Sequence, residues 1–297
     1  MIFQNNDAPL LIVLGQSNAY GHNTRLPPEE RILTPLPNVH GLSRRDNLRL
    51  HPTEVRWSGY TSFGMNLAMP EAQDHTVCLP TLFACQWQQR IDSGEALPDL
   101  YIVFIGRGGQ GVNEYDNADG EPLHMWWPDR PPILEQHPDG SLDLSLFPFT
   151  MDILRLVRRS LLALGKRPIP IGVHWNQWEA EVCTGIRAVR DFPFQFQRVR
   201  QGIQQALRQD YPLFLYRPLS EIYSDPAALR EMTRILEDLA REPGVSLLDL
   251  RTSKLWEPHS RDHGIFQADC VHYTSQVQRW FTAQQWTAPV LQKENIL

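Results

Sequence analysis

A serine near the start of the chain, Ser17, has the setting of a nucleophile in an α/β protein. It follows the aliphatic run 10–14, which predicts a strand buried on both faces, and Gly15 breaks that strand. Open α/β sheets bind ligands beyond the carboxyl ends of their strands, where a hydroxyl assisted by a base could attack a carbonyl group. The alternative is that Ser17 or Asn18 only caps the next helix by accepting its free backbone N–H groups.

A base of the required kind lies near the other end of the chain. Asp269 and His272 are three residues apart, so in a helical or turn-like segment the carboxylate can accept a hydrogen bond from the imidazole Nδ1–H. This arrangement leaves Nε2 free to face a pocket. The same spacing also occurs as a local salt bridge or a cap, so the pair alone does not establish a site.

Two further segments follow predicted strands. The run 107–113, after a strand at 99–106, contains Gly108 and Gly109, and such glycines let the backbone approach a ligand and direct N–H groups toward it. Gly106, Gly108 and Gly111 also have the spacing of a dinucleotide-binding motif. That motif must open an amphipathic helix, and none follows here, which argues against nucleotide binding.

The segment 175–181 follows a strand at 168–174 and carries polar groups suited to a site. Gln177 supplies a neutral amide that can donate to an oxyanion without competing for the serine proton. Glu179 could support the loop or act as an alternative carboxylate partner for His272. A satisfied buried polar network would produce the same cluster of residue types.

The elements that position these residues alternate along the chain. Strands are predicted at 10–14, 99–106, 168–174, 212–217 and 245–250, and helices at 79–91, 150–164, 191–209, 225–241 and 275–285. Such alternation predicts a doubly wound, flavodoxin-like parallel α/β sheet of about five strands with helices on both faces. We expect a single domain over 1–297, interrupted by loop insertions near 21–75 and 114–148. The pair Trp126–Trp127 in the second insertion could form a platform for a sugar ring or a small hydrophobic cluster.

The four motifs together resemble those of SGNH-type hydrolases, specifically the sialate O-acetylesterase-like and acetylxylan esterase-like branch. They occur in the family's order, as Gly15-Gln16-Ser17-Asn18, Gly108-Gly109, Trp175-x-Gln177-x-Glu179 and Asp269-x-x-His272. This chain departs from the family pattern at three positions: Ala19 replaces methionine, Trp178 replaces glycine and Glu181 replaces aspartate. Gly64 lies in a segment where the family has a pocket glycine, although a turn explains it equally well.

The resemblance implies a three-layer SGNH fold and a serine esterase that removes O-acetyl groups from a carbohydrate. Ser17 would be the nucleophile, with His272 as the base that Asp269 orients. The oxyanion would bind to the backbone N–H groups of Ser17 and of Gly108 or Gly109, and to the side chain of Gln177. Glu179 would lie at the same site. No metal or organic cofactor is expected, and the substrate would be an acetylated carbohydrate or another small acetyl ester.

Two other functions remain open from the sequence. Trp178, where the family has glycine, could fill the pocket and leave a catalytically weak or inactive carbohydrate-binding protein on the same fold. A protease or general lipase is less favoured, because Ser17 lacks the Gly-x-Ser-x-Gly elbow.

Composition limits the partners and the compartment. The chain has 297 residues and a formal net charge of −6, which argues against nucleic acid as a partner. The four cysteines lack metal-ligand spacing and predict reduced, mostly buried thiols. The first residues have no basic segment before a short apolar run, so we expect a cytoplasmic protein without membrane attachment unless a leader is missing. The oligomeric state stays open.

Overall fold

A seven-stranded sheet forms the centre of the molecule, in the order β3-β2-β4-β1-β7-β8-β9. The computed structural model describes residues 3–68, 74–115, 124–136, 142–219, 225–260 and 263–292. The strands are β1 (Asp7–Gly15), β2 (Val39–Leu42), β3 (Trp57–Gly59), β4 (Leu100–Gly106), β7 (Arg167–Asn176), β8 (Leu213–Tyr216) and β9 (Val245–Leu248). Neighbouring strands are parallel, except that β2 and β3 are antiparallel.

The predicted fold class is confirmed. The five strands expected from the sequence are β1, β4, β7, β8 and β9, and they lie side by side in the order β4-β1-β7-β8-β9. Counted along the chain this is 2-1-3-4-5, the doubly wound order in which the chain direction across the sheet reverses between β1 and β7. Ligands bind at such a reversal, outside the carboxyl ends of the two strands.

The strand β1 is apolar throughout because both of its faces are covered. Leu10, Ile12 and Leu14 pack in one core cluster, whereas Leu11 and Val13 pack in the other. Successive side chains of a strand point to opposite faces, so an uninterrupted aliphatic run fits a strand between two layers of helices.

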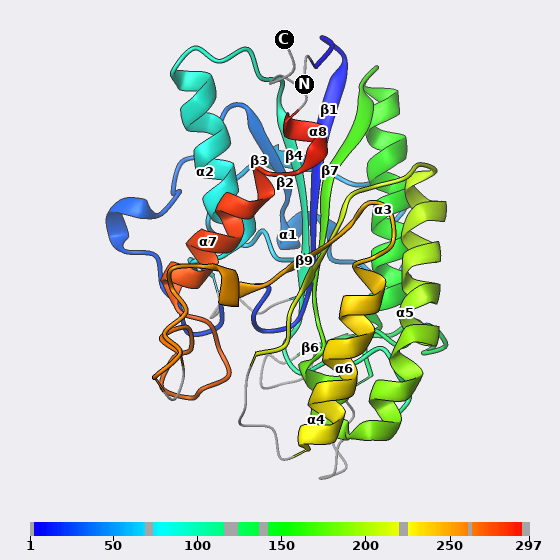
Figure 1. Cartoon of the computed structure of the whole chain (residues 1–297). Helices are drawn as coiled ribbons and strands as arrows, with labels where there is room; N and C mark the ends of the chain where they lie inside the picture. The colour runs from blue at the N-terminus through cyan, green and yellow to red at the C-terminus, as the bar shows by residue number, and fades with distance from the viewer. Residues whose placement is uncertain are drawn as a thin grey trace.

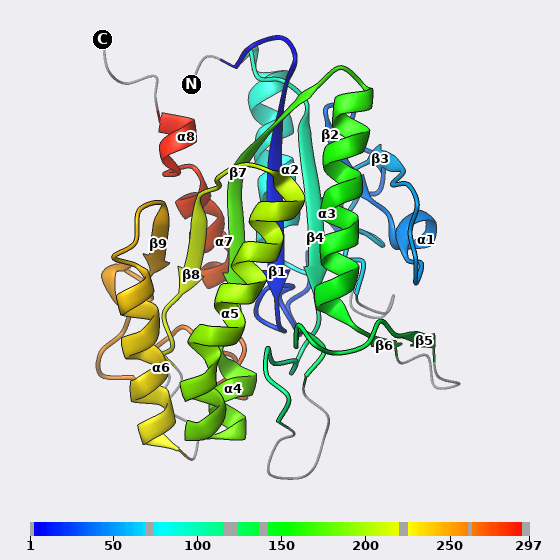
Figure 2. The same cartoon turned by 90° about the vertical axis from the view of Figure 1, so that its right-hand side faces the viewer.

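Helices form a layer on each side of the sheet (Figures 1 and 2). One layer contains α3 (Leu146–Ala163), α5 (Ile186–Leu207) and α6 (Pro226–Leu239), with the short α4 (Glu179–Thr184) preceding α5. The other contains α2 (Leu79–Asp92), α7 (Ser275–Gln285) and α8 (Pro289–Gln292). The carboxyl ends of the central strands point to the lower end in Figure 1, where the segment between β9 and α7, drawn in orange, also lies.

The first insertion contains more regular structure than the sequence suggested. It forms η1 (Pro28–Glu30), β2, α1 (Arg44–Asn47) and β3, so the sheet has two strands beyond the expected five. The strand β2 reads Val-His-Gly-Leu, which has no strand periodicity of its own. Pairing with β4 stabilises it, and this partner lies about sixty residues away in the chain.

The second insertion holds a small hairpin of β5 (Leu134–Gln136) and β6 (Leu142–Leu144), and residues 116–123 and 137–141 lie outside the described parts. Trp126 is fully buried and packs edge-on against Trp175, with ring centroids 4.9 Å apart. This residue is therefore part of the hydrophobic core and is not available as a sugar platform, whereas Trp127 is half-buried.

Two helices begin earlier than expected. The helix α3 starts at Leu146 instead of residue 150, because Pro148 fits within a first turn, where its missing N–H has no helical partner. The helix α5 starts at Ile186 instead of residue 191, directly after Gly185, and contains Pro193 in its interior. The helix α7 has the predicted bounds.

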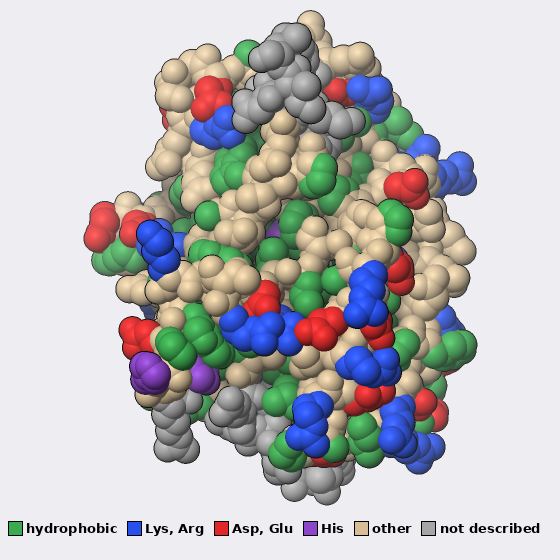
Figure 3. Space-filling view, viewed as in Figure 1, with side chains coloured by type: hydrophobic (Ala, Val, Ile, Leu, Met, Phe, Trp, Pro, Cys, Tyr) green, Lys and Arg blue, Asp and Glu red, His purple; other side chains and the backbone are tan. Residues whose placement is uncertain are grey.

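Charged side chains of both signs are interspersed on the face shown in Figure 3. On α6, for example, Arg234 binds both Glu231 and Asp238. Arg44 forms a largely buried ion pair with Asp74 at 2.9 Å.

All four cysteines are free thiols, but the expectation that most are buried is wrong. Cys78 is buried, Cys85 and Cys270 are half-buried, and Cys183 is exposed. Among the described residues, no helix combines the length and apolar character needed to span a membrane.

Candidate active site

The breaks after three strands lie side by side at one edge of the sheet. Gly15 of β1 is in register with Gly106 of β4 on one side and with Asn176 of β7 on the other. Hydrogen bonds join the residues that follow: Gln16 N–H donates to Asn176 O, and Arg107 N–H donates to Gly15 O, both at 2.9 Å. The segments carrying Ser17, the two candidate glycines and Gln177 therefore start from neighbouring positions.

Gly15 is required at this edge by both conformation and space. Its φ of +139° is unfavourable for residues with a side chain, and a Cβ atom would lie 2.2 Å from the carbonyl oxygen of Asn176. The close approach of β1 and β7 at this point turns the chain sharply, and Ser17 lies in the turn that follows.

Gly108 places the second loop next to Ser17. A Cβ atom on Gly108 would lie 3.5 Å from the Cβ of Ser17 and 2.9 Å from the hydroxyl of Tyr20, so the backbone of this loop approaches the serine closely. Gly109 is exposed and has a φ of +70°, in the left-handed region. Gly108 is therefore close to the candidate nucleophile, and Gly109 is the next residue in the chain.

Asp269 and His272 form the expected hydrogen bond within a turn. The Nδ1 atom of His272 lies 2.8 Å from Oδ2 of Asp269, and Oδ1 accepts from the backbone N–H groups of Val271 and His272, each at 2.9 Å. The turn is closed by Gln267, whose N–H donates to the carbonyl of His272 at 2.7 Å. With Nδ1 engaged, Nε2 is the ring nitrogen left to act as a base.

The hydrogen bonds to Asp269 favour its ionised form. Partial burial by itself would raise the pKa of Asp269, but donation from the backbone and ring of His272 and from the Val271 N–H outweighs burial and holds this pKa below its usual value. A carboxylate that stays ionised can keep an imidazole in one tautomer and stabilise its protonated form.

Asn18, the residue after Ser17, ties the serine turn to the histidine turn. Its Nδ2 donates to the carbonyl of Val271 at 3.2 Å, and its Oδ1 accepts from the N–H of Tyr273 at 2.9 Å. It therefore binds the chain on both sides of His272. Sequence reasoning considered Asn18 only as a helix cap, because a contact across 255 residues of chain leaves no local pattern.

A second link runs from the serine turn through His22. Its N–H donates to the carbonyl of Ser17 at 3.1 Å, and its carbonyl accepts from the side chain of Gln267 at 2.8 Å. The rings of His22 and His272 lie 4.4 Å apart between centroids. Burial lowers the pKa of His22, and the neighbouring His272 lowers it further, so His22 presents a neutral ring beside the candidate base. No pattern in the sequence indicates this contact.

Glu179 binds Asn18 and the backbone of Trp178, and it does not bind the ring of His272. Its Oε1 accepts from Asn18 Nδ2 at 2.8 Å, and its Oε2 accepts from the N–H of Trp178 at 3.2 Å. Burial raises the pKa of Glu179, an effect that the bond from Asn18 opposes. Between the two carboxylates considered from the sequence, Asp269 is the one bonded to Nδ1 of His272.

Gln177 is close to the glycine loop, and its amide is already engaged. Its Nε2 donates to the carbonyl of Gln110 and lies 3.3 Å from Oε1 of Glu181. The two hydrogens of the amide thus have acceptors within the protein. Donation to an oxyanion stays a prediction for this residue, and in the structure it links β7 to the glycine loop.

Trp178 does not bring its indole into the site. The side chain is 1% exposed and belongs to the core cluster that also contains Trp175 and Phe192. Its φ of −175° is extended backbone that any residue adopts, so a side chain causes no strain at this position. Gly64, with a φ of +68° and open space around its Cα, forms a turn.

Within the described ranges, no cluster of three or more His, Cys, Asp or Glu side chains is arranged to hold a metal ion. The arrangement at the sheet edge provides a hydroxyl, an imidazole with an oriented Nδ1, and a glycine backbone next to the hydroxyl. These are the groups that acyl transfer through a serine ester requires.

No family model and no curated protein sequence matches the chain. Among solved structures, it is similar to NanS, with a TM-score of 0.61 and 17% identity over 98% of this chain and 99% of that chain. It is also similar to the X-ray structure of a protein from Arabidopsis thaliana, with a TM-score of 0.58 and 15% identity over 97% of this chain and 99% of that one. At these identities the likeness concerns the fold, which extends over nearly the whole of each chain. The chain therefore has the fold that its resemblance to SGNH-type hydrolases implied.

Proposed function

We propose that the protein is a serine esterase that removes O-acetyl groups from a carbohydrate of the sialate or xylan type. The observation that carries the proposal is the pair of hydrogen bonds by which Asn18 binds the chain on both sides of His272. Ser17 directly precedes Asn18, so these bonds join the turn that carries the serine to the turn that carries the candidate base. The acetyl ester and the carbohydrate are taken from the sequence resemblance.

The reaction would begin with attack of Ser17 Oγ on the acetyl carbonyl carbon, while Nε2 of His272 takes the hydroxyl proton. The tetrahedral intermediate collapses, its C–O bond to the sugar breaks, and the imidazolium returns the proton to the departing sugar oxygen. Water then attacks the acetyl-serine with the same base, releasing acetate and restoring Ser17. Asp269 stabilises the imidazolium in both halves of the reaction.

The negative charge that develops on the carbonyl oxygen would be bound by backbone N–H groups. The closeness of Gly108 to Ser17 supports a role for the N–H of Gly108 or Gly109 beside that of Ser17 itself. Removing one oxyanion donor in a serine hydrolase lowers kcat by about 10²- to 10³-fold. Gln177 contributes through its hydrogen bond to Gln110 of the glycine loop, and direct donation from its amide would require it to leave one present acceptor.

The binding-only alternative depended on Trp178 filling the pocket. The burial of this indole in the core cluster removes that reason, so catalysis is the better supported function.

The experiment is release of acetate from O-acetylated sialate, acetylated xylan and a chromogenic acetyl ester by the wild type, Ser17→Ala and His272→Ala. We expect turnover by the wild type on at least one carbohydrate and a loss of about 10⁴-fold or more in kcat for Ser17→Ala. Wild-type turnover in both variants would refute the proposal. Carbohydrate binding without turnover in the wild type would favour the binding protein instead.

A further inference from the structure

A second buried carboxyl group, that of Glu181, lies directly behind the glycine loop. Its side chain is fully buried in α4, and its Oε1 accepts from the backbone N–H of Val112 at 2.7 Å. Val112 is itself fully buried. This contact joins α4, which follows β7, to the loop that follows β4.

The contact is part of a closed ring of hydrogen bonds. The amide Nε2 of Gln177 donates to the carbonyl of Gln110 and also to the carboxylate of Glu181, while Val112 donates to the same carboxylate. The ring therefore fixes the loop at Gln110 and Val112. Gln110 directly follows Gly109, and Val112 lies two residues further on, so the ring fixes the chain just after the glycine pair.

Burying a charged carboxylate costs free energy, which is unnecessary if its only role at this position is to accept a hydrogen bond. Burial raises the pKa of Glu181 to about 7, although the Val112 N–H and the Gln177 amide oppose this effect, and nearby Glu179 raises the pKa further. A glutamine could accept from Val112 without a buried charge. Buried carboxyl groups with shifted ionisation are concentrated at functional sites, where their charge state matters.

We propose that Glu181 is a positioning residue of the esterase site, whose carboxylate holds residues 108–112 so that the glycine N–H groups face the oxyanion. This inference rests on the function proposed above and adds to it a residue that does not touch the substrate.

The ionised form fits the ring better than the protonated form. The Val112 N–H and the Gln177 amide both point at Oε1 of Glu181, and the same amide nitrogen lies 3.4 Å from Oε2. A proton on Oε1 would take up a lone pair that accepts in the ring, and a proton on Oε2 would place a donor near the Gln177 amide. The titratable groups near Glu181 are Glu179 and Cys183 of the same helix. The loop should therefore become ordered as pH rises through neutrality.

The first test does not depend on activity. Hydrogen–deuterium exchange of the peptide 107–115 is compared in the wild type, Glu181→Met and Glu242→Met. Methionine at position 181 offers no oxygen to accept from Val112, and the control removes an exposed carboxylate that binds Arg200 on the surface. We expect the Val112 amide to exchange about 10- to 100-fold faster in Glu181→Met, as for loss of a hydrogen bond to a charged group, and to be unchanged in the control.

The second test is kinetic and uses a chromogenic acetyl ester. In Glu181→Gln we expect kcat to fall about 10- to 100-fold, less than for outright loss of an oxyanion donor, with KM changed less than about threefold. Below neutral pH the wild-type kcat/KM should fall more steeply than that of Glu181→Gln, because only the wild type has a carboxylate at position 181 to protonate. Glu181→Asp retains the charge on a shorter side chain and should keep the steep dependence, so it carries this test if the glutamine variant does not fold.

Unchanged exchange at Val112 in Glu181→Met would overturn the positioning role whether or not the protein is an esterase. Faster exchange with unchanged kcat and an unchanged pH profile would overturn its part in catalysis. A wild type without turnover, but with faster exchange in the variant, would count against the esterase proposal and leave the loop contact established.

Discussion

Asn18 and Glu179, which lie 161 residues apart in the chain, share a buried hydrogen bond of 2.8 Å. The same amide nitrogen also donates to Val271, so one side chain joins the ends of β1 and β7 to the turn that carries His272. These hydrogen bonds of Asn18, here called the brace, therefore hold the segments of the site together through groups that do not react.

The first prediction concerns this brace. Asn18→Asp replaces the donating amide by a carboxylate next to that of Glu179, so two like charges meet in a buried place and the bond to Val271 is lost. We expect kcat to fall about 100-fold or more and the free energy of unfolding to fall by about 3–5 kcal/mol. Kinetics and urea unfolding measure the two effects, with the exposed Asn5→Asp as the control. A variant as active and as stable as the control would mean that the brace has no role.

The second prediction separates the two candidate carboxylates. In Asp269→Asn the amide nitrogen can face Nδ1 of His272, which favours the tautomer whose Nε2 carries the proton and cannot accept one. We expect kcat to fall about 10³- to 10⁴-fold in Asp269→Asn, and only about tenfold in Glu179→Gln, which can keep its bond to Asn18. Acetyl-ester kinetics at one pH measure both. The reverse order of the two losses would assign the orienting role to Glu179.

The third prediction concerns the close approach of β1 and β7. Gly15→Ala places a methyl group 2.2 Å from the carbonyl oxygen of Asn176, and backbone must move to relieve the clash. Gly165→Ala is the matched control, since that glycine also has a positive φ but has open space around it. We expect the control to lose about 1–2 kcal/mol of stability and Gly15→Ala to lose more than about 4 kcal/mol. Equal losses in urea unfolding would show that the contact is not restrictive.

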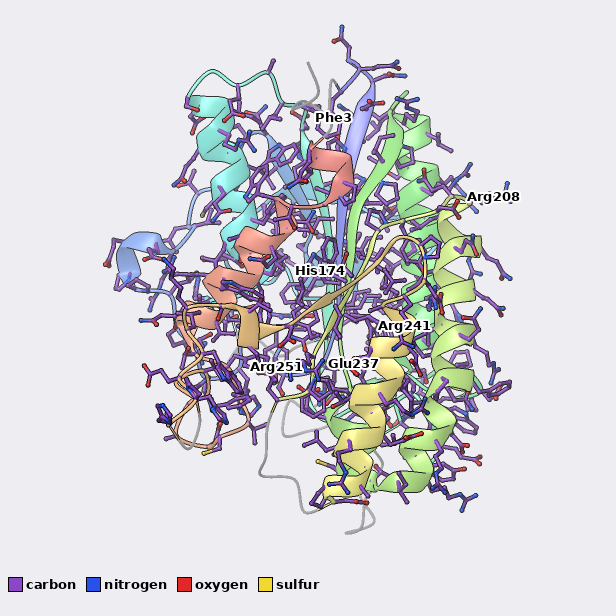
Figure 4. All side chains as sticks on the ribbon, viewed as in Figure 1. Phe3, His174, Arg208, Glu237, Arg241 and Arg251 are labelled. Carbon is purple, nitrogen blue, oxygen red and sulfur yellow. The ribbon has the colours of Figure 1, made fainter. Side chains whose placement is uncertain are left out.

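The fourth prediction is a pH dependence of stability that comes from His174, which Figure 4 shows in the middle of the molecule. This fully buried ring lies between the hydroxyl of Tyr216 at 2.8 Å and Oε1 of Gln285 at 2.6 Å, and stacks on Phe214. Burial lowers the pKa of His174 from 6.5 to about 4, although the bond to Gln285 opposes burial.

Because the unfolded chain takes up a proton near pH 6.5 and the folded protein does so only near pH 4, the stabilisation is complete above pH 6.5 and is lost as pH falls toward 4. We expect His174 to account for about 3 kcal/mol of that loss. Urea unfolding of His174→Gln should show lower stability at neutral pH and a flatter dependence between these limits, whereas the exposed His51→Gln should follow the wild type. A profile in His174→Gln as steep as in the wild type would exclude this origin.

The sequence predicted the five parallel strands β1, β4, β7, β8 and β9 well because their signal is local. Apolar runs such as 10–14 and 100–105 are long, contain β-branched residues and are bounded by glycine, and the predicted bounds of α7 match the structure. The strands β2 and β3 were missed because they are short and depend on pairing with distant parts of the chain.

The site was predictable only as far as its motifs extend. Asp269 and His272 are neighbours in sequence, and their hydrogen bond follows from the spacing. The contacts of Asn18 with Val271, of His22 with His272, and of Glu181 with Val112 join distant segments, and polar residue types alone do not reveal which segments meet. Trp178 shows the converse, since its bulk suggested a blocked pocket and its burial in the core could be known only from the fold.

The most direct measurement is mass-spectrometric mapping of the adduct formed with a fluorophosphonate, which reacts with activated serine hydroxyls. An adduct on Ser17 of the wild type that is lost in Ser17→Ala and forms at least about 100-fold more slowly in His272→Ala is the expected result. A wild type in which Ser17 stays unmodified while acetyl esters are still hydrolysed would show that another residue performs the reaction.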